Sequence, residues 1–179
     1  MKKIILLLLL IPIVSLGQKK SLLTKSGVSL TFDKPEGMKE SPSGPAMNPN
    51  VLVQYLKENN TPGGYTIIAN IIDDPRAIAE INNMKKEDLY KILAQSTFTE
   101  TDKAGNSNKL IDVRTMDVKG KLFGWSLTET NSIAHTVTYY YYIKNTAILI
   151  AGTNEISSFE NFYIGFIDFV SSIEINWKN

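Results

Sequence analysis

The chain of 179 residues contains no cysteine and only one histidine. Without cysteine it cannot form disulfides, use a thiol nucleophile, bind zinc through sulfur or carry a lipid on a cysteine, so its stability must come from packing. Neither sign of charge dominates, with 19 Lys and Arg against 18 Asp and Glu, and no basic stripe follows the pattern of a phosphate-binding surface. These absences argue against redox enzymes, cysteine hydrolases and nucleic-acid-binding proteins.

Long hydrophobic runs are also scarce, and the longest stands at the start of the chain. Residues 4–14 are apolar apart from one proline, Lys2 and Lys3 precede them, and the small residues Ser15 and Gly17 follow. This is the three-part pattern of a secretory signal peptide. The run has about 11 residues, whereas a membrane-spanning helix needs roughly 20. The sequence therefore predicts a signal peptide over residues 1–17, cleavage after Gly17, and an exported protein, periplasmic or secreted, with no membrane span.

The rest of the chain is predicted to be a polar lead-in over residues 18–27 and one globular domain over residues 28–179. Alternating or continuous apolar runs indicate many short strands with turn residues between them. Residues 33–49 hold four of the seven prolines, which predicts an irregular surface loop. The expected strands cover residues 28–32, 51–56, 65–72, 110–118, 122–130, 135–143, 147–151 and 173–175.

Helices are expected at three places. Asp74-Pro75 is typical of a helix start, which predicts a short helix over residues 75–82. Apolar residues at helical spacing predict another over residues 86–97. For the last helix, Ser157 and Glu160 have the spacing of a capping box. An apolar stripe then follows, so its aromatic residues should be buried; its members are Phe159, Phe162, Tyr163, Phe166, Ile167 and Val170.

The order of these elements predicts an α+β fold. Strands joined by short turns favour an antiparallel sheet, and well-separated apolar helices must each cover part of it. We therefore expect one antiparallel β-sheet sandwiched between helices.

The order and spacing of the elements resemble those of the Mog1/PsbP-like group. The resemblance covers roughly residues 27–175, from the early strand and Pro35-x-Gly37 to the closing helix that ends at residues 169–175. It implies an antiparallel sheet between helical layers. Members of the group mostly bind other proteins: one branch assists the oxygen-evolving complex of a photosystem, and another binds a small GTPase. No functional residue of either branch matches a position in this chain.

Few residues offer catalytic or metal-binding chemistry. His135 is the only histidine, and neither a G-x-S-x-G sequence nor an H-E-x-x-H spacing accompanies it. Asp73 and Asp74 are the best pair of carboxylates for Ca²⁺, although a helix cap explains Asp74 as well. Gly63-Gly64 is not followed by the Lys-Ser/Thr of a phosphate-binding loop. We therefore assign no catalytic residue, no metal and no cofactor from the sequence.

Four consecutive tyrosines, residues 139–142, occupy a predicted strand. Alternate residues of a strand face opposite sides. Either all four belong to the core and its rim, or one pair, Tyr140 and Tyr142, lines an exposed binding surface. Pro42 and Pro45 in the long loop are the other candidates for a partner contact, because long loops often carry such contacts.

The function that the sequence favours is an exported, non-catalytic binding or accessory protein whose partner is another envelope or secreted protein. A small exported hydrolase is one alternative, which His135 and two carboxylates converging in a pocket would support. A structural or assembly component of the cell envelope is another, which a large exposed apolar patch or a stable oligomer would support. The sequence leaves the identity of the ligand and the oligomeric state open.

Overall fold

The computed structural model describes residues 19–58, 61–98 and 105–177. The predicted signal peptide over residues 1–17 lies outside these ranges. Within them, no helix combines the length and the apolar character needed to cross a membrane.

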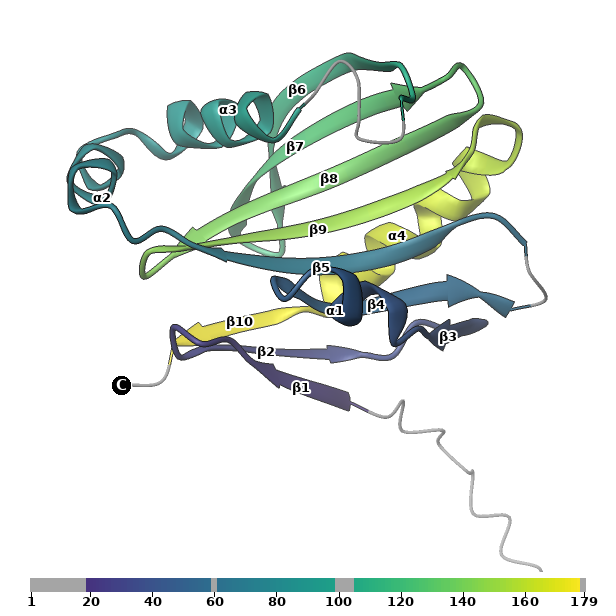
Figure 1. Ribbon diagram of the computed structural model, residues 1–179, viewed down its shortest axis with the longest axis horizontal. Coiled ribbons are helices and arrows are strands. Elements are labelled where there is room, and N and C mark those ends of the chain that lie inside the picture. Colours follow the sequence, from purple (N-terminus) through teal and green to yellow (C-terminus); the bar gives the residue numbers. More distant parts are fainter. Residues whose placement is uncertain (1–18, 59–60, 99–104, 178–179) are drawn as a thin grey trace, which may run out of the picture.

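A seven-stranded sheet forms the centre of the fold, and all its neighbouring strands are antiparallel (Figure 1). Its order is β3-β4-β5-β9-β8-β7-β6, so the four strands of the second half of the chain lie together. The strands are β3 (Met38–Glu40), β4 (Val51–Lys57), β5 (Gly64–Ile71), β6 (Asn108–Val118), β7 (Lys121–Thr130), β8 (Ala134–Ile143) and β9 (Thr146–Glu155).

A second, three-stranded sheet has the order β1-β2-β10. It consists of β1 (Lys19–Leu23), β2 (Val28–Asp33) and β10 (Glu174–Trp177). The sequence predicted a single sheet and a polar lead-in over residues 18–27, and both predictions need correction. Residues 19–23 form an edge strand because they pair with β2, and the predicted first and last strands leave the central sheet to pair with each other.

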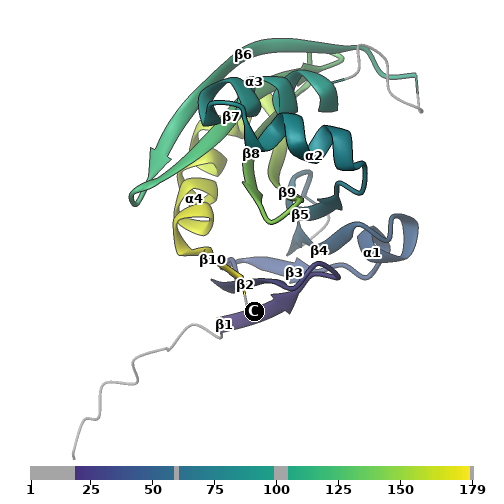
Figure 2. The same cartoon turned by 90° about the vertical axis from the view of Figure 1, so that its left-hand side faces the viewer.

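Helices cover both faces of the central sheet. Helix α3 (Lys86–Thr97) packs on β6, β7 and β8, and α2 (Pro75–Asn82) precedes it. Helix α4 (Phe159–Ser172) contacts β9 and β2, so it lies on the other face, between the two sheets (Figure 2). The predicted α+β class, with an antiparallel sheet between helices, is confirmed.

Two hydrophobic clusters lie on the two faces of the central sheet. The larger fills the space between α4, the central sheet and β2, and Phe166 within it has no exposed surface. The smaller joins Leu89 and Tyr90 of α3 to Tyr140 and Leu149 of the sheet. The predicted burial of Phe166 is therefore confirmed.

Two local predictions are wrong. Residues 33–49 are not an irregular loop throughout, because they include strand β3 and the short helix α1 (Ser43–Met47). The predicted capping box does not form either, because Ser157 belongs to a 3₁₀ turn, η2 (Ile156–Ser158), and α4 begins after Ser158. The Oγ of Ser158 instead accepts a hydrogen bond of 2.8 Å from Nδ2 of Asn154.

Candidate functional site

Helix α3 covers only part of the sheet face on which it lies. Residues Thr136, Thr138 and Tyr140 of β8 point to this face, because alternate residues of a strand share a side. The helix packs closely at the Tyr140 end: a Cβ on Gly124, which pairs with Tyr140, would lie 2.6 Å from the Cβ of Tyr90. A pocket of about 230 Å³ opens where this cover ends.

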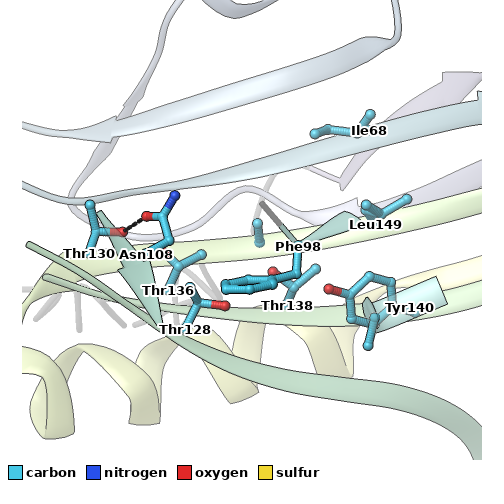
Figure 3. A pocket seen from close by; sticks show the side chains of 11 residues that line it. Ile68, Phe98, Asn108, Thr128, Thr130, Thr136, Thr138, Tyr140 and Leu149 are labelled. Carbon is cyan, nitrogen blue, oxygen red and sulfur yellow. Dashed lines mark hydrogen bonds between the residues drawn. The ribbon is translucent and has the colours of Figure 1, made fainter. Parts of the chain in front are cut away.

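The pocket combines apolar carbon with neutral hydrogen-bonding groups (Figure 3). The apolar part comes from α3, the residue after it, β5 and β9. The polar part comes from β6, β7 and β8 and consists of hydroxyl groups and one amide. The apolar residues are Ile68, Ala94, Phe98, Leu149 and Ala151, and the polar residues are Asn108, Thr128, Thr130, Thr136, Thr138 and Tyr140.

Strand register brings the threonine hydroxyls of the pocket side by side. Thr128 of β7 pairs directly with Thr136 of β8, and Oγ1 of Thr136 lies 2.9 Å from Oγ1 of Thr153 on β9. At the edge of the sheet, Oγ1 of Thr130 donates a 2.7 Å hydrogen bond to Oδ1 of Asn108. The result is a strip of hydroxyl groups across neighbouring strands, which continues from the pocket to the exposed Thr153.

Among the described residues that line the pocket, none is an Asp, Glu, Lys, Arg or His. The phenol of Tyr140 lies 2.9 Å from the buried Oγ of Ser126, so these two hydroxyls form a hydrogen bond within the protein. General acid–base catalysis needs a titratable group within reach of the substrate, with a pKa near the working pH. The described part of the lining supplies none, and its chemistry fits the binding of a neutral group with both apolar and hydrogen-bonding parts.

The structure separates the residues that the sequence proposed as a binding surface. Tyr140 lines the pocket but is only 3% exposed, so it is not part of an open surface. Tyr142 is partly buried against the α3 cluster, and its hydroxyl donates to Oδ1 of Asn145 at 3.4 Å. Pro42 and Pro45 are exposed beside and within α1, which packs on β4.

All four consecutive tyrosines are buried or partly buried, which agrees with the first of the two interpretations of this segment. Tyr139 and Tyr141 belong to the cluster under α4, whereas Tyr140 and Tyr142 belong to the cluster under α3. Burial raises the pKa of the Tyr139 phenol, and a hydrogen bond of 3.2 Å joins it to the hydroxyl of Tyr163. The tyrosines thus serve mainly to attach the two helices to the sheet.

His135 lies on the face opposite the pocket. Its ring meets the ring of Phe159 edge-on at 5.1 Å, and its Nε2 lies 3.4 Å from a carboxylate oxygen of Glu129. Glu129 is the one carboxylate that pairs with it within the described residues. The two converging carboxylates that would indicate a hydrolase are therefore not found beside this histidine in that part of the chain.

Asp74 acts as the N-cap of α2, where its Oδ1 accepts a 2.9 Å hydrogen bond from the backbone N–H of Arg76. In the part of the chain that the structure describes, no three His, Asp or Glu side chains gather closely enough to hold a metal ion. Asp73 and Asp74 thus gain no third carboxylate or imidazole ligand from those residues.

Sequence reasoning missed the threonine strip, although its signal is present. Threonine recurs at positions 128 and 130 and again at 136 and 138, the spacing of one strand face. Placing these four residues beside one another required the antiparallel register of β7 and β8, and recognising a pocket required knowing where α3 ends.

No protein-family model matches the chain, and no curated protein matches it. Solved structures, in contrast, match the chain. The chain is similar to cyanobacterial PsbP (CyanoP) from Synechocystis sp. PCC 6803, with 14% identity over 91% of this chain and 95% of that one, at a TM-score of 0.56. It is also similar to a protein from Bacteroides thetaiotaomicron VPI-5482, with 10% identity over 90% of this chain but only 50% of that one, at a TM-score of 0.52.

The Ran-binding protein Mog1p of Saccharomyces cerevisiae matches with 10% identity over 88% of this chain and 95% of that one, at a TM-score of 0.46. At these identities the comparisons bear on the fold alone. The assignment rests on the likeness to cyanobacterial PsbP, which extends over nearly the whole of both chains. The chain has the Mog1/PsbP-like fold.

Proposed function

We propose that the protein is an exported, non-catalytic binding or accessory protein, and that its partner is another envelope or secreted protein. One observation carries this proposal: every described residue that lines the pocket beside α3 has an apolar or a neutral hydrogen-bonding side chain. Such a lining can hold and orient a group but has no residue suited to moving a proton at neutral pH.

The size of the pocket favours a side chain of a protein over a whole small molecule. Its volume of about 230 Å³ lies below the roughly 300–1,000 Å³ that is typical of small-molecule sites. Protein interfaces commonly bury a few anchor side chains in pockets and surround them with weaker contacts. Here the exposed end of the threonine strip, at Thr153, would lie under the partner surface around such an anchor.

The experiment uses residues 18–179 as bait in the envelope fraction of the source organism. Thr138→Trp fills the pocket, and Thr138→Val removes only the hydroxyl group. Leu23→Trp, at a 67% exposed position of β1, is the matched control. We expect Thr138→Trp to abolish capture, Thr138→Val to weaken it, and Leu23→Trp to leave it unchanged, with circular dichroism confirming that each variant folds.

A partner captured equally by all these proteins would overturn the assignment of the pocket. If the protein turned over a substrate and this turnover persisted in the Thr138→Trp variant, the non-catalytic role would be overturned. Export is tested separately by N-terminal sequencing of the protein from its native source: we expect Gln18 as the first residue, and a protein that begins at Met1 would contradict export.

A further inference from the structure

A groove runs along α4 on the other side of the central sheet from the pocket. It consists of two adjoining hollows of about 300 and 410 Å³, which share Glu36, Tyr65 and Gly165. Its walls are α4, the connection between β2 and β3, and the ends of β4 and β5.

The floor of the groove is the side chain of Tyr65. This residue is 4% exposed, and its ring packs at 5.0–5.1 Å from the rings of three α4 residues, Phe162, Phe166 and Phe169. Its hydroxyl has no hydrogen-bond partner among the described residues, yet the residue lines both hollows. Burial, with a smaller contribution from the nearby Asp168 carboxylate, raises the pKa of the phenol to about 12, so the phenol remains protonated and uncharged at neutral pH.

Gly165 leaves the tyrosine hydroxyl accessible. It is an exposed residue in the middle of α4, where glycine is less favourable than alanine. A Cβ at this position would meet the Tyr65 hydroxyl at 3.3 Å, and among the described residues no other atom outside the adjacent turns of α4 would come within 4 Å. The missing side chain therefore opens the helix surface directly above this hydroxyl.

The first hollow is rich in unpaired negative charge. Asp33, Glu36 and Asp168 line it, and Lys34 is the one cation among the described residues of this lining. None of the three carboxylates belongs to an ion pair in the described part of the chain. Together with the absence there of any metal-sized group of ligands, this favours a larger organic cation over a metal ion.

We propose that this groove binds the charged end of a lysine or arginine side chain from an extended segment of a partner protein. The carboxylates lie around the cation, and the phenol oxygen of Tyr65 accepts a hydrogen bond from one of its N–H groups. The aliphatic stem of the side chain lies against Pro35 and Phe169, which are part of the same lining. This site is separate from the pocket beside α3, so neither proposal depends on the other.

The test is an NMR titration of ¹⁵N-labelled protein with two small probes, N-acetylarginine methylamide and its neutral analogue N-acetylcitrulline methylamide. The arginine probe should produce saturable shifts at the backbone amides of Glu36, Gly165 and Asp168, and the citrulline probe should not. Asp168→Asn and Tyr65→Phe should each weaken binding by about two- to fivefold, the range of an exposed ion pair. Asp88→Asn, at an exposed position of α3, is the matched control and should bind as the wild type does.

Equal shifts with both probes would overturn the proposal, because the site would then not recognise charge. Amide shifts that the arginine probe produces equally at acidic residues elsewhere on the surface would overturn it too. So would binding of the arginine probe that Asp168→Asn leaves unchanged. These measurements do not involve the pocket beside α3. The arginine titration can therefore fail while capture of a partner still depends on Thr138, and partner capture can fail while the groove still binds the arginine probe.

Discussion

The substitution Phe166→Ala should destabilise the protein more than any other truncation in α4. Phe166 has no exposed surface, and its ring centre lies 5.0 Å from that of Tyr65, 5.9 Å from Tyr139 and 6.2 Å from Phe162. Removing a buried Phe side chain costs about 3–5 kcal/mol, and less when the surroundings can collapse into the space.

The surroundings of Phe166 cannot easily collapse into the cavity that Phe166→Ala leaves. The loss of stability should therefore lie near the upper end of that range. Below the ring lies Gly152 of β9, where even a Cβ would come within 2.8 Å of the ring. The backbone of a central strand is held by partners on both sides, β5 and β8, and cannot move into the cavity. We therefore expect a loss of about 4–5 kcal/mol in the free energy of unfolding.

Urea denaturation followed by tryptophan fluorescence would measure this loss, and thermal unfolding should show a melting temperature about 8–20 °C lower for a domain of this size. Phe159→Ala is the matched control, since Phe159 is only half-buried at the start of the same helix. It should cost about 1–2 kcal/mol. A melting temperature for Phe166→Ala equal to that of the wild type, or of Phe159→Ala, would refute the buried position of this helix.

Three further predictions concern a helix cap, a turn and pH. Asp74→Ala should lower the free energy of unfolding by about 0.5–2 kcal/mol in urea denaturation because it removes the N-cap of α2. Asp74→Asn should keep most of this stabilisation, because asparagine also caps helices. Gly63→Ala should cost about 1–3 kcal/mol, since Gly63 has φ +120° and a Cβ there would lie 2.4 Å from Oδ1 of Asn154; an unchanged urea midpoint would contradict this. Burial raises the pKa of Tyr65 and Tyr90 to about 12, above the value of about 10 in the unfolded chain. The folded state therefore binds more protons than the unfolded state between pH 10 and 12, and the urea midpoint should fall as the pH rises through this range. A urea midpoint that rises over the same range would contradict the prediction.

Elements whose own residues carry the pattern could be predicted from the sequence. Helices α2 and α3 span the expected residues, 75–82 and 86–97, because a capping Asp-Pro pair and an apolar stripe mark them locally. Strands β4 and β5 were also expected, over residues 51–56 and 65–72, and the structure pairs them with each other. The burial of Phe166 followed from helical spacing alone.

The elements that escaped prediction owe their structure to distant partners. β1 begins Lys-Lys-Ser and has a weak pattern of its own, and it is a strand because it pairs with β2. β3 has only three residues and forms along β4, with Met38 opposite Lys57. Ser157 failed as an N-cap because a 3₁₀ turn moved the start of α4 by one residue.

Both candidate sites were hidden for the same reason. The threonines that line the pocket are regularly spaced in the sequence, but the position of α3 on the folded sheet decides which of them the helix covers. The groove joins three parts of the chain that are far apart in sequence, represented by Glu36, Tyr65 and Gly165. Neither a motif nor a local periodicity connects those residues, so they become a site only in the folded protein.

The pairing of β10 with β2 has a consequence for the time course of folding. Val28, near the beginning of the described domain, pairs with Trp177, at its end, and β10 directly follows α4. Helix α4 is therefore held at its start by β9 and at its end by β2, and the second attachment is completed by the pairing of β10 with β2. The domain therefore cannot complete its core until β10 is available to pair with β2. Pairing across such a sequence separation also predicts slower folding than that of a helical bundle of equal length.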